Sequence, residues 1–244
     1  MPDGLSQGNI MQHRNRTLVD PSRLSRRRLI ANVAVACLLP SWLTRHEAAL
    51  AADYPATAAA MRAAQETEMG VYYRYTEFGR KAQQEGYRGI AYLFVAFASA
   101  ELIHASNFGR ILARLNVEVA PISKPEVKVG ATRDNLIVAA DGEIRSVDDF
   151  YPNLLEKIRP EGHEDAMAAV RYAWATEERH RDKIRQIQRW SPTFFEQVAR
   201  AVDQKTGQYF VCQICGNTTN EVPSGTCPVC KNPTTHYRRI EPPA

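Results

Sequence analysis

The chain has 244 residues, of which 44% are hydrophobic and 24% are charged, so it can bury one sizeable core and form a smaller additional unit. This balance excludes a collagen, a coiled coil and a wholly disordered chain. The formal net charge of +4 arises in residues 1–52, which hold seven arginines against three carboxylates. The remaining residues are charge-balanced, so we expect no nucleic-acid partner.

The N-terminal tract has the pattern of an export signal. An arginine-rich segment, Ser25–Ile30, leads into an apolar run at 29–39, and small residues follow around Ala51. This order is typical of a secretory signal peptide, and the paired arginines favour the twin-arginine route. We therefore expect residues 1–51 to be a twin-arginine-type signal and the mature protein to be periplasmic or otherwise exported. An arginine-rich tail, an uncleaved anchor and a lipoprotein cut at Cys37 are the alternatives.

Four long helical patterns follow, separated by glycine- and proline-containing breaks. They lie at 57–84, 87–115, 132–159 and 163–190. The long connection between the second and third favours an up-down bundle with one crossover. In the second pattern, Glu101 is the only formally charged residue between Gly89 and Gly109. Polar side chains interrupt this stretch, so we expect a core helix and no stable membrane insertion of the mature chain.

One spacing recurs in the two halves of this region. In each half a leading glutamate precedes a turn glycine by 18 or 19 residues, and the glycine precedes a Glu-x-x-His motif by 15. The chain therefore holds two helix pairs, each with one glutamate on its first helix and a Glu-x-x-His motif on its second. The residues are Glu68, Gly86, Glu101 and His104 in the first half, and Glu143, Gly162, Glu177 and His180 in the second.

These repeated groups have the composition of a two-metal site. Residues three apart share a helix face, so each motif projects a carboxylate and an imidazole to one point. Four carboxylates balance two divalent cations, and oxygen-rich sites with histidine favour iron or manganese over zinc. Glu66 and Glu77 compete with Glu68, but only Glu68 fits the repeat. Bundles with this ligand set have the ferritin-like di-iron architecture.

A cysteine-rich module lies near the C-terminus. It contains Cys212-x-x-Cys215 and Cys227-Pro-x-Cys230, two knuckles that can hold one ion tetrahedrally. A segment of this size cannot fold on an apolar core alone, so the metal is needed for folding as well. The spacing does not separate iron from zinc, and two disulfides are the alternative in an oxidising compartment.

Taken together, these motifs resemble those of rubrerythrin over about residues 56–241. The resemblance implies a mainly α fold, in which a ferritin-like four-helix bundle at 52–203 precedes a small metal-bound, rubredoxin-like β module at 204–244. It implies a di-iron site that reacts with hydrogen peroxide and a cysteine-bound iron that delivers electrons. The implied di-iron ligands, which are also the catalytic residues, are Glu68, Glu101, His104, Glu143, Glu177 and His180, with Glu101 and Glu177 as bridges. The implied ligands of the single iron are Cys212, Cys215, Cys227 and Cys230.

One position departs from the pattern of this family. The family usually has a further carboxylate three residues after the third-helix glutamate, where this chain has Ser146. That carboxylate takes part in a redox-linked ligand exchange, so Ser146 favours a ferroxidase or dioxygen-reducing oxidase as the alternative to a peroxidase. An iron-binding or zinc-ribbon protein without turnover is the third hypothesis. The resemblance also implies an electron donor, which the sequence does not identify, and a homodimer.

Overall fold

The computed structural model describes residues 53–188, 195–197, 199–202 and 207–243. All of them belong to one compact unit, Leu39–Ala244. The predicted export signal at residues 1–51 lies outside the described residues, and export stays a prediction.

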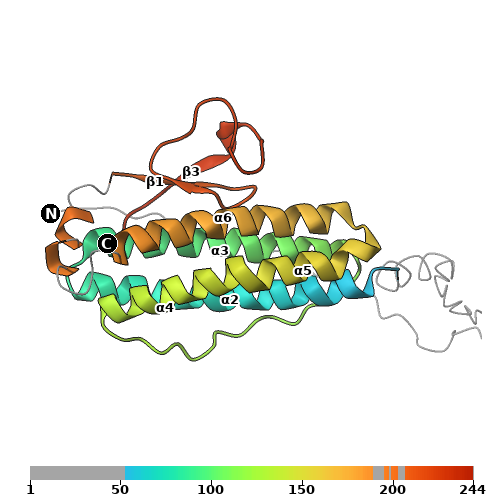
Figure 1. Cartoon of the computed structure of the whole chain (residues 1–244), viewed down its shortest axis with the longest axis horizontal. Helices are drawn as coiled ribbons and strands as arrows, with labels where there is room; N and C mark the ends of the chain where they lie inside the picture. The colour runs from blue at the N-terminus through green and yellow to red at the C-terminus, as the bar shows by residue number, and fades with distance from the viewer. Residues whose placement is uncertain (1–52, 189–194, 198, 203–206, 244) are drawn as a thin grey trace, which may run out of the picture. The chain divides into compact units, whose positions relative to one another are not determined.

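Long helices form the body of this unit (Figure 1). They confirm the predicted four-helix bundle, because the third predicted helix is continuous through a π-helical turn, Ser146–Phe150. The connection between the second and third predicted helices runs along the outside of the bundle as the predicted crossover (Figure 1). The helices are α2 (Pro55–Gln84), α3 (Arg88–Arg114), α4 (Thr132–Arg145), α5 (Tyr151–Ile158) and α6 (Glu164–Gln188).

The π-helix explains an irregularity in the sequence repeat. The two halves are offset by 75 residues at Glu68 and Glu143 but by 76 at Tyr75 and Tyr151 and at all later pairs. The second half therefore has one extra residue between Glu143 and Tyr151, and the π-helix lies in this interval. A π-turn accommodates an added residue without breaking the helix, so Tyr151 regains the position equivalent to Tyr75.

The turns of the two halves also exchange helix caps. Gly86 and Gly162 have φ of 86° and 65°, the left-handed conformation that glycine adopts at low cost. The glutamate before each glycine caps the first helix of the opposite half. Glu161 accepts hydrogen bonds from the first amide groups of α2, and Glu85 accepts one of 2.8 Å from Thr132 N in α4. This exchange joins the two halves at both ends.

Two apolar clusters fill the bundle, one toward each end. The first includes Phe78, Phe94 and Ile184, and the second includes Met61 and Phe108. On α2, α3 and α6 the predicted ligands fall between the residues of the two clusters. The polar site is therefore enclosed by packed apolar layers on both sides.

Helix α3 is long and apolar enough, by composition, to cross a membrane, and it is the one such helix among the described residues. However, 72% of its most apolar stretch is buried inside the protein. This burial is the pattern expected of a core helix.

The C-terminal module is a small β structure, as predicted, and its strands pair antiparallel. Its strands are β1 (Tyr209–Cys212), β2 (Thr218–Thr219) and β3 (Tyr237–Ile240), in the order β2-β1-β3. The sheet is anchored on α3 by Tyr92, whose hydroxyl accepts a hydrogen bond from Tyr209 N and donates one to Ile240 O. The rings of Tyr92 and Tyr209 also pack edge to face at 4.9 Å.

The crossed caps predict a pH-dependent contribution to stability. Partial burial opposes ionisation of Glu161, but the hydrogen bonds from Thr57 and Ala56, both 2.7 Å, prevail and lower its pKa. We expect Glu161→Ala to reduce the free energy of unfolding by about 1 kcal/mol at pH 7. A lowered folded-state pKa stabilises the fold above the unfolded value, about 4.3, and this contribution is lost as the pH falls through the folded value. Urea unfolding at several pH values measures the difference.

Glu156→Ala is the matched control, because Glu156 is exposed on α5. Equal stability of the two variants at pH 7 would contradict the capping role of Glu161.

Candidate metal centres

The structure brings all six predicted bundle ligands together at mid-height, from α2, α3, α4 and α6. None of them exposes more than 3% of its surface. They form two overlapping donor groups that share Glu101 and Glu177. One group adds Glu68 and His104, and the other adds Glu143 and His180. Shared membership in both groups is what a bridging carboxylate requires.

The distances between donor atoms fit two adjacent ions. His104 Nδ1 lies 3.0 Å from Glu101 Oε2 and 2.9 Å from Glu177 Oε1. His180 Nδ1 lies 3.2 Å from Glu101 Oε1 and 3.1 Å from Glu177 Oε2. Each shared carboxylate therefore presents one oxygen to each histidine. Ligands at about 2.1 Å from an ion and at right angles to one another are about 3 Å apart, as these are.

The electrostatics of the cluster also indicate cations. Burial, with the charges of Glu101 and Glu177, raises the pKa of Glu68 well above its usual value. Burial and Glu177 do the same to Glu143. The buried oxygens Glu101 Oε1 and Glu177 Oε1 face the Nδ1 atoms of His180 and His104. So many buried carboxylates are stable only if protons or cations neutralise them.

The histidines respond in the opposite direction. Burial alone would lower their pKa values, but the adjacent carboxylates prevail. They raise the pKa of His104 well above its usual value and that of His180 to about 9. Burial alone would raise the pKa of Glu177, but His180 and His104 lower it well below its usual value. Protonated histidines thus neutralise part of the carboxylate charge that metal ions would neutralise in a loaded site.

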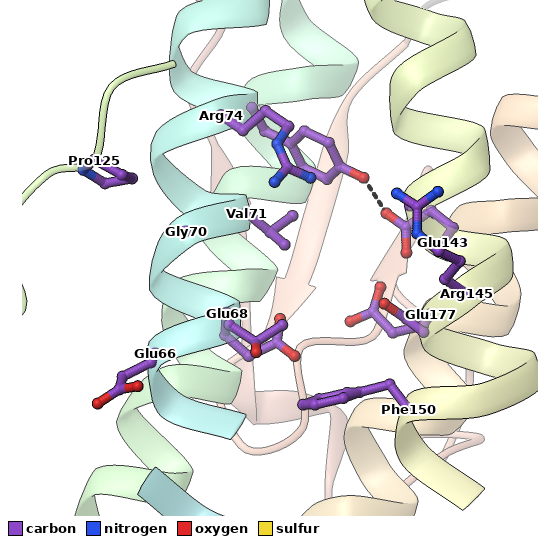
Figure 2. Close-up of a pocket in the computed structure, with 14 residues that line it drawn as sticks. Glu66, Glu68, Gly70, Val71, Arg74, Pro125, Glu143, Arg145, Phe150 and Glu177 are labelled. Atoms are coloured by element: carbon purple, nitrogen blue, oxygen red, sulfur yellow. Dashed lines mark hydrogen bonds between the residues drawn. The ribbon is translucent and has the colours of Figure 1, made fainter. Parts of the chain in front are cut away.

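Two buried tyrosines hold the terminal carboxylates crosswise. The hydroxyl of Tyr75 donates to Glu143 Oε1, and that of Tyr151 donates to Glu68 Oε1 (Figure 2 shows the first bond as a dashed line). Each tyrosine thus orients the carboxylate of the opposite half. Burial and the neighbouring glutamates raise the pKa of both tyrosines, so both hydroxyls stay protonated.

The outer nitrogens of the two histidines face the cysteine module. His104 Nε2 lies 3.1 Å from the carbonyl oxygen of Cys215, and His180 Nε2 lies 3.4 Å from Thr218 Oγ1. With Nδ1 directed at the metal cluster, Nε2–H of His104 can donate to that carbonyl. Such a partner fixes the orientation of a metal-binding imidazole. The ring of His180 also stacks on Phe97, with centroids 3.9 Å apart.

The four cysteines of the C-terminal module form the second candidate metal centre. All four are buried and free of disulfides, so the disulfide alternative does not hold in this structure. Cys212 Sγ lies 3.8 Å from Cys230 Sγ, and Cys215 Sγ lies 3.6 Å from Cys227 Sγ. Sulfur atoms at about 2.3 Å from one tetrahedral ion are about 3.8 Å apart. Both centres therefore fit the metals implied by the sequence.

The competing residues and Ser146 stay outside the donor groups. Glu66 is exposed at the rim of a pocket, and Glu77 forms ion pairs with Arg80 and Lys124. Ser146 is half-buried on the π-helix. Among the described residues, no further carboxylate joins the six ligands.

The junction between the two centres could not be predicted from the sequence. A Cβ at Gly216, where φ is 80°, would lie 2.4 Å from His104 Nε2. The only signal was the glycine that ends the first knuckle. The pairing of Gly216 with His104 is a tertiary contact between residues far apart in the chain.

Sequence reasoning also did not find the pocket beside the bundle site (Figure 2). Its volume is about 520 Å³, and three of the ligand glutamates line it with Arg74 and Arg145. In the sequence, the only feature that marks Arg74 is its position next to Tyr75.

A buried cluster of four carboxylates and two histidines in a four-helix bundle defines a ferritin-like di-iron carboxylate protein. Residues 60–188 match the rubrerythrin family model. The chain belongs to the rubrerythrin family.

Individual relatives agree with this assignment. Nigerythrin of Nitratidesulfovibrio vulgaris is 30% identical over 177 residues, which cover 71% of this chain and 81% of the relative. Rubrerythrin of Porphyromonas gingivalis is 30% identical over 171 residues, covering 69% and 82%. Among solved structures, the mixed-valence state of nigerythrin superposes with a TM-score of 0.63 at 27% identity, covering 75% of this chain and 86% of that one.

The shared position of Glu101 predicts a selective loss of metal. We expect Glu101→Ala to lower the iron content from about three ions per chain to about one, because both bundle ions lose a ligand while the cysteines are untouched. Metal analysis and the visible absorption of the cysteine-bound iron measure the two sites separately. Glu66→Ala, on the exposed rim, should retain full occupancy. Equal loss of both kinds of site would contradict their separate assignment.

Proposed function

We propose that this protein is a di-iron peroxidase that reduces hydrogen peroxide to water and receives electrons through its cysteine-bound iron. The observation that supports this most strongly is the hydrogen bond between His104 Nε2 and the Cys215 carbonyl, since it joins a proposed ligand of one centre to a ligand of the other. Neither iron storage nor a purely structural zinc site requires a direct contact between the two centres. The proposed catalytic ligands are those predicted from the sequence.

Reduction of one peroxide to two waters takes two electrons and two protons. A reduced di-iron centre supplies the electrons when it is bound. The chain provides a buried site between two apolar clusters, and the hydroxyls of Tyr75 and Tyr151 keep Glu143 and Glu68 in place. The adjacent pocket gives the oxidant access to the ligand carboxylates. Solved states of nigerythrin are described as mixed-valence and as all ferrous, so a relative is known in several oxidation states.

The second candidate is a dioxygen-reducing oxidase or ferroxidase. Ser146 favours it, because the donor set has six members without a further carboxylate. Arg74 and Arg145 oppose the ferroxidase form, since two guanidinium groups beside the site repel an incoming ferrous ion.

Anaerobic stopped-flow mixing separates these candidates. We expect the fully reduced protein to regain the colour of the ferric cysteine site rapidly with hydrogen peroxide and slowly with dioxygen. A faster reaction with dioxygen would favour the oxidase. A protein that never shows the colour would hold zinc in the cysteine module and have no internal electron relay.

The junction at Gly216 predicts where electron transfer can be interrupted. Gly216→Ala would push a methyl group against His104 Nε2, and we expect re-reduction of the oxidised bundle site to slow by about tenfold or more. Gly225→Ala is the matched control, because Gly225 also has a positive φ of 78° but has no other atom within 4 Å of its Cβ position. Equal slowing in both variants would mean that backbone strain, rather than the contact with His104, causes the effect.

We propose in addition that residues 52–203 and 204–244 form the ferritin-like and rubredoxin-like domains. We also propose that the protein forms a homodimer and receives electrons from a separate donor. The contact between His104 and Cys215 lies within one chain, so this contact needs no second subunit.

We propose that residues 1–51 direct export by the twin-arginine route. N-terminal sequencing of protein from the exported fraction should give a start near Ala52. An intact terminus in the cytoplasmic fraction alone would contradict export.

A further inference from the structure

The pocket beside the bundle site is larger than hydrogen peroxide requires. Its volume is about 520 Å³, whereas a water molecule, which is only slightly smaller than hydrogen peroxide, occupies about 30 Å³ in the liquid. Pockets for organic ligands have volumes of roughly 300–1,000 Å³. The pocket therefore has the size of an organic ligand site.

The lining of this pocket has three distinct parts (Figure 2). The first part consists of carboxylates of the proposed ligand set, which come from α2, α4 and α6. A molecule in the pocket therefore lies next to the proposed metal site. Val71, Phe150 and Pro125 provide apolar surface. Arg74 on α2 and Arg145 on α4 provide two guanidinium groups.

Neither guanidinium group is neutralised by a neighbour. Among the residues that the structure describes, Arg74 and Arg145 have no ion pair or hydrogen bond, whereas Arg80 pairs with Glu77 and Arg114 pairs with Asp165. Arg74 reaches across from α2 to α4, because its Nη1 lies 3.7 Å from the Cβ position of Gly142. It is half-buried there, so its charge lies within the pocket wall.

The remaining charge of the lining is positive. Two divalent cations balance the four ligand glutamates. Glu66 is then the one uncompensated carboxylate of the lining against two arginines. The lining therefore favours an anionic group on the molecule that it binds.

Small residues keep the pocket open. Gly70, Gly142 and Ser146 all line it, and Ser146 lies at the start of the π-helix that accommodates the extra residue of the second half. A longer side chain at Ser146 would occupy part of this volume. The serine at this position therefore leaves space in the pocket where a longer carboxylate side chain would lie.

We propose that this pocket binds an organic hydroperoxide that carries an acidic group, with the peroxide directed at the ligand carboxylates and the acid at Arg74 and Arg145. The proposal rests on the peroxidase function proposed above and names a substrate class for the same site. The hydroperoxide ROOH takes up two electrons and two protons, its O–O bond breaks, and the products are ROH and water. The electrons are those that a reduced di-iron centre supplies, both ions ending ferric, and the protons come from solvent.

Kinetics with matched peroxides test the proposal. The iron-loaded, reduced protein is mixed with hydrogen peroxide, with cumene hydroperoxide and with its para-carboxylate derivative. We expect the carboxylate derivative to react about tenfold or more faster than cumene hydroperoxide at low concentration, the equivalent of one charge-assisted hydrogen bond. This ratio should fall toward one in Arg74→Gln and in Arg145→Gln. It should persist in Arg80→Gln, whose arginine lies on α2 outside the pocket.

A binding measurement gives a readout that needs no turnover. Cumenesulfonate has the same ring and an anionic group but no peroxide, and sulfonates are weak ligands of iron. Calorimetric titration of the oxidised, iron-loaded protein should show binding that weakens by about tenfold in Arg74→Gln and Arg145→Gln but not in Arg80→Gln.

Three results would overturn the proposal. A reaction with hydrogen peroxide but with no preference for the anionic peroxide would refute the substrate class and leave the peroxidase function intact. Equal binding of cumenesulfonate to the wild type and both pocket variants would refute the role of the arginines. No reaction of the reduced protein with hydrogen peroxide or with either organic peroxide would refute the peroxidase function and this inference with it.

Discussion

Burial of four carboxylates and two imidazoles at the centre of a helical bundle is the constraint on which this structure depends. Such a cluster is stable only when cations or protons neutralise it, and the chain surrounds it with features that hold it in one geometry. Two apolar clusters enclose it. Two tyrosines fix its terminal carboxylates, and two turn glutamates cap the helices of the opposite half. The tyrosines and the capping glutamates occur once in each half of the repeat, whereas each apolar cluster contains residues of both halves.

The cysteine module breaks this twofold pattern, because it packs on one side of the bundle. His104 hydrogen-bonds to a backbone carbonyl of a cysteine knuckle, while His180 faces a threonine hydroxyl and stacks on Phe97. The two halves of the metal cluster thus have different surroundings despite similar ligands. The contact at Gly216 leaves no room for a larger residue, so the separation of the two centres is fixed by close packing rather than by a flexible linker.

The sequence was sufficient to predict the helices and the two groups of residues that the structure brings together, six in the bundle and four cysteines. Helix geometry requires residues three apart to share a face, and the internal repeat showed which glutamates belong together. The π-helix also had a signal, since the offset changes from 75 to 76 between Glu143 and Tyr151. That change shows where a residue is added but does not specify how the helix accommodates it.

The pocket and the junction could not be predicted in this way. Both arise from contacts between elements distant in the chain, such as Arg74 against Gly142 and Gly216 against His104. Spacing within one helix carries no information about which side chain of another helix it will meet. An arginine next to a tyrosine in the sequence carries no signal of a pocket, and only the fold places Arg74 in the pocket wall.

An anomalous difference map, collected at the iron absorption edge from crystals of the iron-loaded protein, tests directly whether the buried cluster holds two ions. We expect two peaks between Glu101 and Glu177, one beside His104 Nδ1 and one beside His180 Nδ1, and a third peak among the four cysteines. A bundle with no peak, or with a single peak bound by only one histidine, would contradict a two-metal site.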